Sequence, residues 1–199
     1  MTLANTNKRV AVPAAVRRAY GELDRSQVIA ALYNLTRRVG VQRVTMRELA
    51  TELGVAVPSV YYHVPGKQAA LDLLAESVLA EIQVPEAGAW DVRLTELYCS
   101  SRDVLLFVPG VAGLLENNRG GEQARRLDRI SRSLLAEAGL ARAAATAAHV
   151  VLYTYLLGSV NLEESLAVTG RAPGKRQAAA RFRAGLDVII AGIRATAVW

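Results

Sequence analysis

The sequence predicts an all-α protein with a small N-terminal three-helix unit joined to a larger helical body. Apolar residues recur three and four positions apart, Ala and Leu dominate, and no stretch shows the sustained alternation that is typical of strands. Charge divides the chain in the same way. Residues 1–67 carry a net charge of +6, whereas residues 68–199 sum to zero. Such an excess predicts an N-terminal module that binds a polyanion, although a merely solvated basic face would look the same.

The N-terminal helices are delimited by recognisable caps and breakers. Residues 1–22 are expected to form a flexible basic arm. The first helix begins after Asp24 or Ser26 and ends at Gly40. Its inward stripe consists of Val28, Ala31, Leu32, Leu35 and Val39.

A capping box then opens a second, shorter helix. The Thr45 hydroxyl can accept the backbone N–H of Glu48, whose side chain reaches back, and this helix ends at Gly54. Val57-Pro58 begins the third helix, because proline is pre-set for a first helical turn. The remaining helices are expected over residues 67–82, 91–108, 111–117, 122–138, 143–166 and 176–197, with a loop at 169–174.

Composition excludes several classes of protein. At 52% hydrophobic residues the chain is not disordered, and no apolar run approaches the roughly 18 residues of a membrane span. The single cysteine, Cys99, excludes an intramolecular disulfide and a Cys-based zinc site. We expect a soluble cytoplasmic protein without cofactor or metal. It is also not expected to be an enzyme, because no nucleophile–base pair, phosphate loop or carboxylate cluster stands out.

Residues 45–64 predict a helix-turn-helix. Their buried face is expected to contain Leu49, Leu53, Val55, Val60 and Val64, with Gly54 at the sharp turn. The second helix of the motif would then present two tyrosines and a histidine outward. A helix lying in a DNA major groove would present such a face.

Residues 24–79 resemble the DNA-binding domain of the TetR family of repressors. The motifs VTMRELATELGV (44–55) and PSVYYHVPGK (58–67), together with the preceding Arg-Val-Gly, are most similar to the tetracycline-repressor-like branch. The resemblance implies a cytoplasmic homodimer that binds a palindromic operator in double-stranded DNA and is released by a small-molecule effector. It divides the chain into an arm (1–22), a helix-turn-helix DNA-binding domain (23–68) and an effector-binding and dimerisation domain (69–199).

The resemblance also assigns DNA contacts by position. Arg47 matches a residue that reaches a guanine edge, which suits its bidentate fork. Val57 stands where a polar, base-bonding side chain is usual, so we expect a different operator. Tyr61 could instead be mostly core, and His63 could merely cap a helix end. The full set of expected DNA contacts is Thr45, Arg47, Val57, Pro58, Ser59, Tyr61, Tyr62, His63 and Lys67.

An effector cavity should be apolar with a few convergent polar groups. Tyr98 and Arg102 share a helix face, as do His149 and Tyr153, although His149 could equally be a core histidine. Pro109-Gly110 resembles a movable gate. The expected effector-binding residues are Tyr98, Arg102, Phe107, Asn117, His149 and Tyr153.

Dimerisation is expected to use the last two long helices, although in a monomer both stripes could be core. The first stripe is Ala144, Ala148, Leu152, Tyr155 and Ser159, and the second is Phe182, Leu186, Ile189 and Ile193. Two readings remain open: a ligand-responsive repressor, and a ligand-independent DNA-binding regulator or architectural protein.

Overall fold

The structure, a computed structural model, describes residues 23–117 and 120–197. Within these ranges the chain forms only helices, as the sequence predicts. They are α1 (Arg25–Val39), η1 (Val41–Arg43), α2 (Met46–Leu53), α3 (Val57–His63), α4 (Lys67–Ala80), α5 (Trp90–Leu106), α6 (Val111–Asn117), α7 (Glu122–Glu137), α8 (Arg142–Val168) and α9 (Lys175–Thr196). The short 3₁₀ turn η1 was not predicted. The expected arm, with Arg9, Arg17 and Arg18, lies outside the described residues.

The caps predicted from sequence form the ends of the first helices. The Asp24 carboxylate accepts the Gln27 N–H at 2.8 Å, and the Thr45 hydroxyl accepts the Glu48 N–H at 3.1 Å. Gly54 ends α2 in the left-handed conformation at φ 67°, which glycine adopts without steric cost. These ends set the angle between α2 and α3, and α1 packs on α2 behind them.

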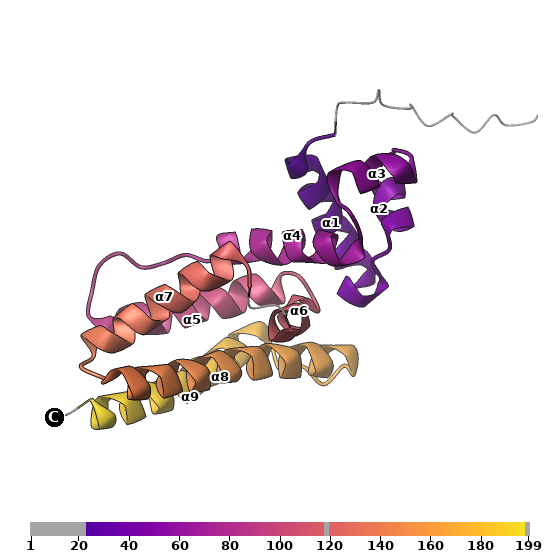
Figure 1. Cartoon of the computed structure of the whole chain (residues 1–199). Coiled ribbons are helices and arrows are strands. Elements are labelled where there is room, and N and C mark those ends of the chain that lie inside the picture. Colours follow the sequence, from indigo (N-terminus) through magenta and orange to yellow (C-terminus); the bar gives the residue numbers. More distant parts are fainter. Residues whose placement is uncertain (1–22, 118–119, 198–199) are drawn as a thin grey trace, which may run out of the picture.

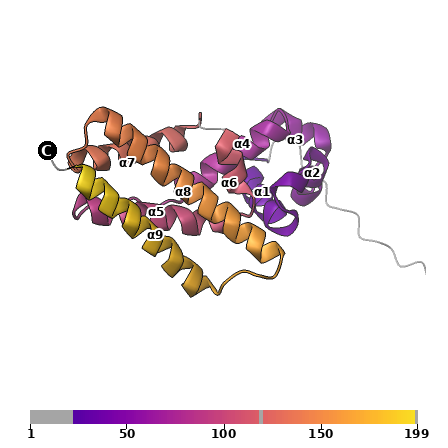
Figure 2. The ribbon, with the colours of Figure 1, turned by 90° about the horizontal axis from the view of Figure 1, so that it is seen from below.

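Helix α4 joins the N-terminal group to the body (Figure 1). It packs on α1 at one side and on α5, α6 and α7 at the other. In the body, α5 lies among α7, α8 and α9, and α8 and α9 run side by side in both views (Figures 1 and 2). The boundary we expected between residues 68 and 69 falls inside α4, so one continuous helix belongs to both parts.

Of the two stripes expected at a dimer interface, the one on α9 lies mostly inside the chain, whereas the one on α8 is mostly half-buried. Phe182, Leu186 and Ile193 of α9 are buried within one protomer, as is Leu152 of α8. The Tyr155 and Phe182 rings stack at 5.1 Å, and the Tyr155 hydroxyl donates to the Phe182 carbonyl at 2.9 Å. These residues therefore hold α8 against α9 in the same protomer. Other apolar side chains on the two helices stay exposed, namely Val150, Val151, Leu162, Val168 and Val188.

By length and composition alone α8 could cross a membrane, although the chain has no uninterrupted apolar run of the length of a membrane span. A long apolar helix of a helical protein meets the same criteria, and 28% of the most apolar window of α8 is buried within one chain. Here α8 packs against α5, α6, α7 and α9, and it carries His149, Glu163 and Glu164.

Candidate functional site

The face of α3 that points away from the body is rich in exposed aromatic side chains. Val60 is buried beneath it and anchors the helix, whereas Tyr62 is 81% exposed and Tyr61 47% exposed. The rings of Tyr62 and His63 meet edge to face at 5.2 Å. Tyr61 is thus not a core residue. Pro58 is also exposed, while Val57 and Ser59 are half-buried, and Val57 packs against the hydrophobic core.

Two expected DNA contacts lie at the start of α2. The Thr45 hydroxyl is engaged in the capping box, because it accepts the Glu48 N–H and donates to the Glu48 carboxylate at 2.9 Å. Thr45 remains exposed beside this box. Arg47, in the first turn of α2, is exposed as well.

Lys67 has a partner that the sequence did not suggest. Its ammonium group donates to the Gln42 carbonyl at 3.0 Å and so ties the start of α4 to η1. The side chain is otherwise exposed. A phosphate contact by Lys67 would therefore have to be made next to, or instead of, this internal hydrogen bond.

A cavity of about 250 Å³ lies inside the body. Leu and Ile side chains from α4 to α8 form most of its wall, and a group of polar side chains closes one end. Its lining includes Leu79, Ile82, Leu97, Leu105, Leu115, Leu127, Leu156 and Leu157, with Tyr98, Asp128, Ser131, Arg132, His149 and Tyr153. This is the composition expected of a small-molecule site.

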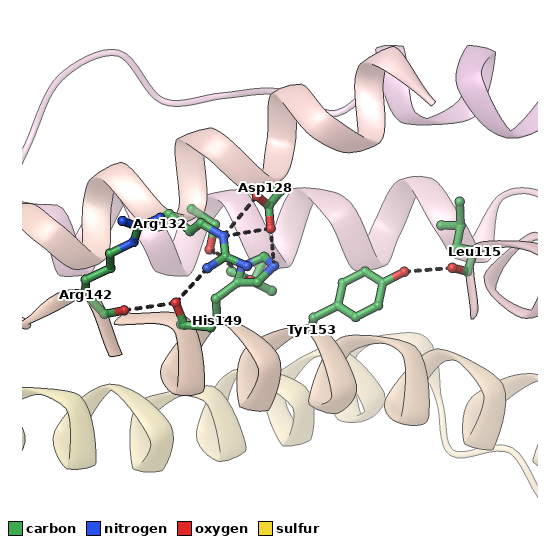
Figure 3. Close-up of polar contacts among 9 residues, drawn as sticks. Leu115, Asp128, Arg132, Arg142, His149 and Tyr153 are labelled. Atoms are coloured by element: carbon green, nitrogen blue, oxygen red, sulfur yellow. Dashed lines mark hydrogen bonds and ion pairs between the residues drawn. The ribbon is translucent and has the colours of Figure 1, made fainter. Parts of the chain in front are cut away.

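The polar end is a continuous hydrogen-bonded chain. The Ser131 hydroxyl lies 3.1 Å from both the Tyr98 hydroxyl and His149 Nδ1. On its other side the His149 ring places Nε2 2.8 Å from the Asp128 carboxylate, which also receives Arg132 Nε at 2.9 Å (Figure 3). Burial raises the pKa of Tyr98 well above its usual value, so this phenol stays protonated.

Tyr153 forms the wall next to this polar end. Its ring stacks on His149 at 6.2 Å, and its hydroxyl donates to the Leu115 carbonyl of α6 at 3.0 Å (Figure 3). Tyr98, His149 and Tyr153 therefore meet in one cavity, as the sequence suggested. Asp128, Ser131 and Arg132 were missed. Ser131 is a small polar residue on the otherwise apolar, buried face of an amphipathic helix. That position in the sequence could have identified it as a candidate polar group in the cavity.

The other expected effector residues do not join this cavity. Arg102 is buried, but its guanidinium is bound to Glu163 at 2.5 and 2.8 Å, and it lies over the Phe182 ring toward α9. Phe107 is 56% exposed beneath the Arg37 guanidinium. The side chain of Asn117 lies outside the described part of the chain.

Asp128, His149 and Ser131 form a hydrogen-bonded series of the kind used in hydrolases, which the spacing of these residues in the sequence did not predict. Acyl transfer also needs preorganised N–H donors for the oxyanion. Ser131 lies inside α7, where neighbouring backbone N–H groups are already used by the helix. In addition, Ser131 is fully buried and bonded to Tyr98. The arrangement is therefore suited to binding rather than to nucleophilic attack.

The body touches the N-terminal domain at the corner between α5 and α6. The Gly110 Cα approaches Val41 so closely that a Cβ there would lie 3.2 Å from the Val41 Cβ. The Gly110 N–H donates to the Glu164 carboxylate of α8 at 3.0 Å. Nearby, the Arg37 guanidinium carbon lies 4.5 Å from the centroid of the Phe107 ring. The corner between α5 and α6 thus contacts both η1 and α1, and it is bonded to α8. A movement of α6 or α8 would therefore be felt at these contacts.

In the described ranges, no three His, Cys, Asp or Glu side chains lie close enough together to hold a metal ion.

Two family models match the chain. Residues 28–74 match "Bacterial regulatory proteins, tetR family", and residues 84–180 match "Tetracyclin repressor-like, C-terminal domain".

A transcriptional regulator of Saccharopolyspora erythraea is 33% identical over 144 residues, which cover 71% of this chain but only 61% of that protein. The class A tetracycline repressor from transposon 1721 of Escherichia coli is 35% identical over 147 residues, which cover 72% of this chain and 68% of that protein. Among solved structures, a TetR variant from Acinetobacter baumannii AYE in complex with minocycline superposes with a TM-score of 0.79 at 31% identity, covering 89% of this chain and all of that one.

Proposed function

Because the chain belongs to the TetR family of bacterial regulatory proteins, we propose that it is a cytoplasmic transcriptional repressor that binds a palindromic operator as a homodimer and leaves it when a small molecule fills the cavity. Residues 23–68 bind DNA in this proposal, residues 69–199 bind effector and dimerise, and residues 1–22 form a basic arm. No catalytic residue is assigned.

The observation that carries the proposal is the exposed face of α3. Two tyrosines and a histidine are exposed on a helix that Val60 anchors, and Tyr62 is 81% exposed. Side chains of this kind contact base edges, thymine methyls and phosphates when a helix enters the major groove. We assign these contacts to Arg47, Val57, Pro58, Ser59 and Tyr62 for the bases, and to Thr45, Tyr61, His63 and Lys67 for the phosphates.

The exposed apolar side chains of α8 and α9 support the dimer. Val151, Leu162 and Val188 lie in solvent within one protomer. Small residues surround them, including Ala147 and Gly158 on α8 and Ala184 and Ala191 on α9, and these let a second pair of helices approach closely. A two-fold contact here would place two copies of α3 to read two half-sites.

A continuous set of contacts connects the cavity with the DNA-binding domain. Tyr153 lines the cavity and holds α6 through Leu115, and the corner that precedes α6 rests on Val41. A ligand that displaces Tyr153 changes the support of α6, and with it the contact to η1. Coupling requires that the ligand distinguish two arrangements, since equal affinity for both would shift nothing.

The experiment begins with selection of the operator from randomised DNA by the purified full chain. Fluorescence anisotropy on the selected duplex and on a scrambled one then gives the specificity. We expect specific binding with an even number of protomers per duplex and a selected site that is palindromic. Equal affinity for both duplexes would contradict the repressor function. If the selected duplex is bound specifically and no cavity ligand changes the affinity, the ligand-independent regulator is the correct reading.

A further inference from the structure

When His149 is neutral, the hydrogen bonds at the polar end of the cavity run in one direction. An ionised carboxylate only accepts, so Asp128 requires a proton on His149 Nε2. The other nitrogen of the neutral ring is then an acceptor, and Nδ1 receives the Ser131 hydroxyl proton. With its own proton given to His149, Ser131 accepts the Tyr98 hydroxyl proton.

Tyr98 therefore ends this chain as an acceptor. Its one proton is used by Ser131, and none of the described residues donates to its two lone pairs. Tyr98 cannot offer a negative charge, because burial raises its pKa and keeps the phenol neutral. A ligand oxygen that can only accept would face an acceptor here, whereas a ligand O–H would complete the chain.

The remaining walls restrict the shape of the ligand. His149 and Tyr153 both line the cavity, and their rings stack on each other with an angle of 23° between the planes. A flat aromatic molecule can pack against such a pair of rings. The volume of about 250 Å³ exceeds the roughly 150 Å³ of a cavity that holds benzene. It falls below the range of about 300–1,000 Å³ for drug-sized ligands.

We propose that the effector is a planar aromatic molecule of one or two rings with a neutral hydroxyl group that donates a hydrogen bond to the Tyr98 oxygen. This inference rests on the proposed function only in treating the cavity as the effector site. The protein then selects a hydrogen-bond donor through a chain of three hydrogen bonds that runs from Asp128 through His149 and Ser131 to Tyr98.

Three probes with one skeleton test the proposal. Isothermal titration calorimetry of the full chain without DNA, at pH 8, would compare 2-naphthol (a donor), 2-methoxynaphthalene (an acceptor only) and naphthalene. We expect 2-naphthol to bind about 10-fold more tightly than the other two, which is the value of one hydrogen bond of about 1.4 kcal/mol. Equal affinity for all three, or tighter binding of 2-methoxynaphthalene than of 2-naphthol, would overturn it.

Two variants locate the effect. Tyr98→Phe removes the acceptor, so 2-naphthol should bind within about twofold of naphthalene. Ser131→Ala frees the Tyr98 proton, so 2-methoxynaphthalene should gain several-fold. The matched control is Tyr155→Phe, which removes a hydroxyl that is bonded to Phe182 outside the cavity, and it should keep the preference for 2-naphthol. A preference that survives in Tyr98→Phe would overturn the proposal.

Operator binding is measured separately, by anisotropy with and without 2-naphthol. If 2-naphthol binds with the expected preference and operator affinity does not change, the ligand class is supported and the repressor function fails. If another compound releases the operator and 2-naphthol binds no better than naphthalene, the repressor function is supported and the ligand class fails.

Discussion

The Tyr153 hydroxyl donates to the Leu115 carbonyl oxygen at 3.0 Å and thereby joins the wall of the cavity to α6. Leu115 itself lines the cavity, and α6 packs on both α4 and α8. One hydrogen bond thus connects the place where a ligand would bind with the helix that supports the DNA-binding domain.

Tyr153→Phe tests this connection without any ligand. Losing a hydrogen bond worth about 0.5–1.5 kcal/mol should let α6 open more often, so amide hydrogen exchange in residues 111–116 should accelerate by roughly 2–12-fold. The measurement is hydrogen-exchange mass spectrometry on α6 peptides. Tyr155→Phe is the control and should leave α6 unchanged, since its hydroxyl bonds to α9. Unaltered exchange in the Tyr153 variant would show that the bond does not hold α6.

Arg47→Ala tests base reading. If the guanidinium binds a guanine edge, the variant should lose about 1–3 kcal/mol on the selected operator and much less on scrambled DNA. Arg176→Ala changes an exposed arginine in the first turn of α9 and serves as the charge-matched control. Equal losses on the two duplexes would mean that Arg47 contacts only phosphate.

Val188→Asp tests the dimer surface. Val188 is 73% exposed within one protomer, and burying an unpaired carboxylate in a helix–helix contact is costly. Analytical ultracentrifugation should show a dimer for the natural chain and mainly monomer for the variant. Val92→Asp, at an exposed valine on α5, should remain dimeric. A dimeric Val188 variant would place the interface elsewhere.

Gly121 and Glu76 form a pair that a double-mutant cycle can test. The Glu76 carboxylate accepts the Gln123 N–H at 2.9 Å, and a Cβ on Gly121 would overlap its other oxygen. Gly121→Ala should therefore push Glu76 away and cost about 1–2 kcal/mol of unfolding free energy in urea titrations. In a Glu76→Ala background the same change should cost much less. Additive effects would show that the two residues are independent.

Glu164→Gln tests the pH dependence of stability. Burial raises the pKa of Glu164, and the Gly110 N–H only partly opposes this. A raised pKa in the folded state means that stability falls as pH rises from the unfolded value, about 4.3, through the folded one. The neutral variant should be more stable than the natural chain at pH 7, and this advantage should shrink toward pH 4. Glu86→Gln, at an exposed position, should show no difference at either pH.

Local signals were enough to predict the fold. Asp24, Thr45 and Gly54 act at the ends of their own helices, so neighbouring residues in the sequence carry the information. The site depended on contacts between helices. Arg102 and Tyr98 share a helix face in the sequence, yet Glu163, sixty-one residues away, holds Arg102 toward α9. Similarly, periodicity could not tell whether Phe182 and Leu186 meet α8 of their own chain or of a partner, because both surfaces are apolar.

A molecule bound in the cavity is expected to weaken operator binding at α3, and operator DNA is expected to weaken binding in the cavity. The direct measurement is the operator dissociation constant, by anisotropy, with and without a saturating compound that calorimetry has shown to bind the natural chain and to lose affinity in Tyr98→Phe. Coupling of about 1–3 kcal/mol predicts operator binding that is roughly 5–150-fold weaker with the compound, and compound binding weakened by the same factor when operator is present. An operator dissociation constant that stays the same while the compound occupies the cavity would contradict the account.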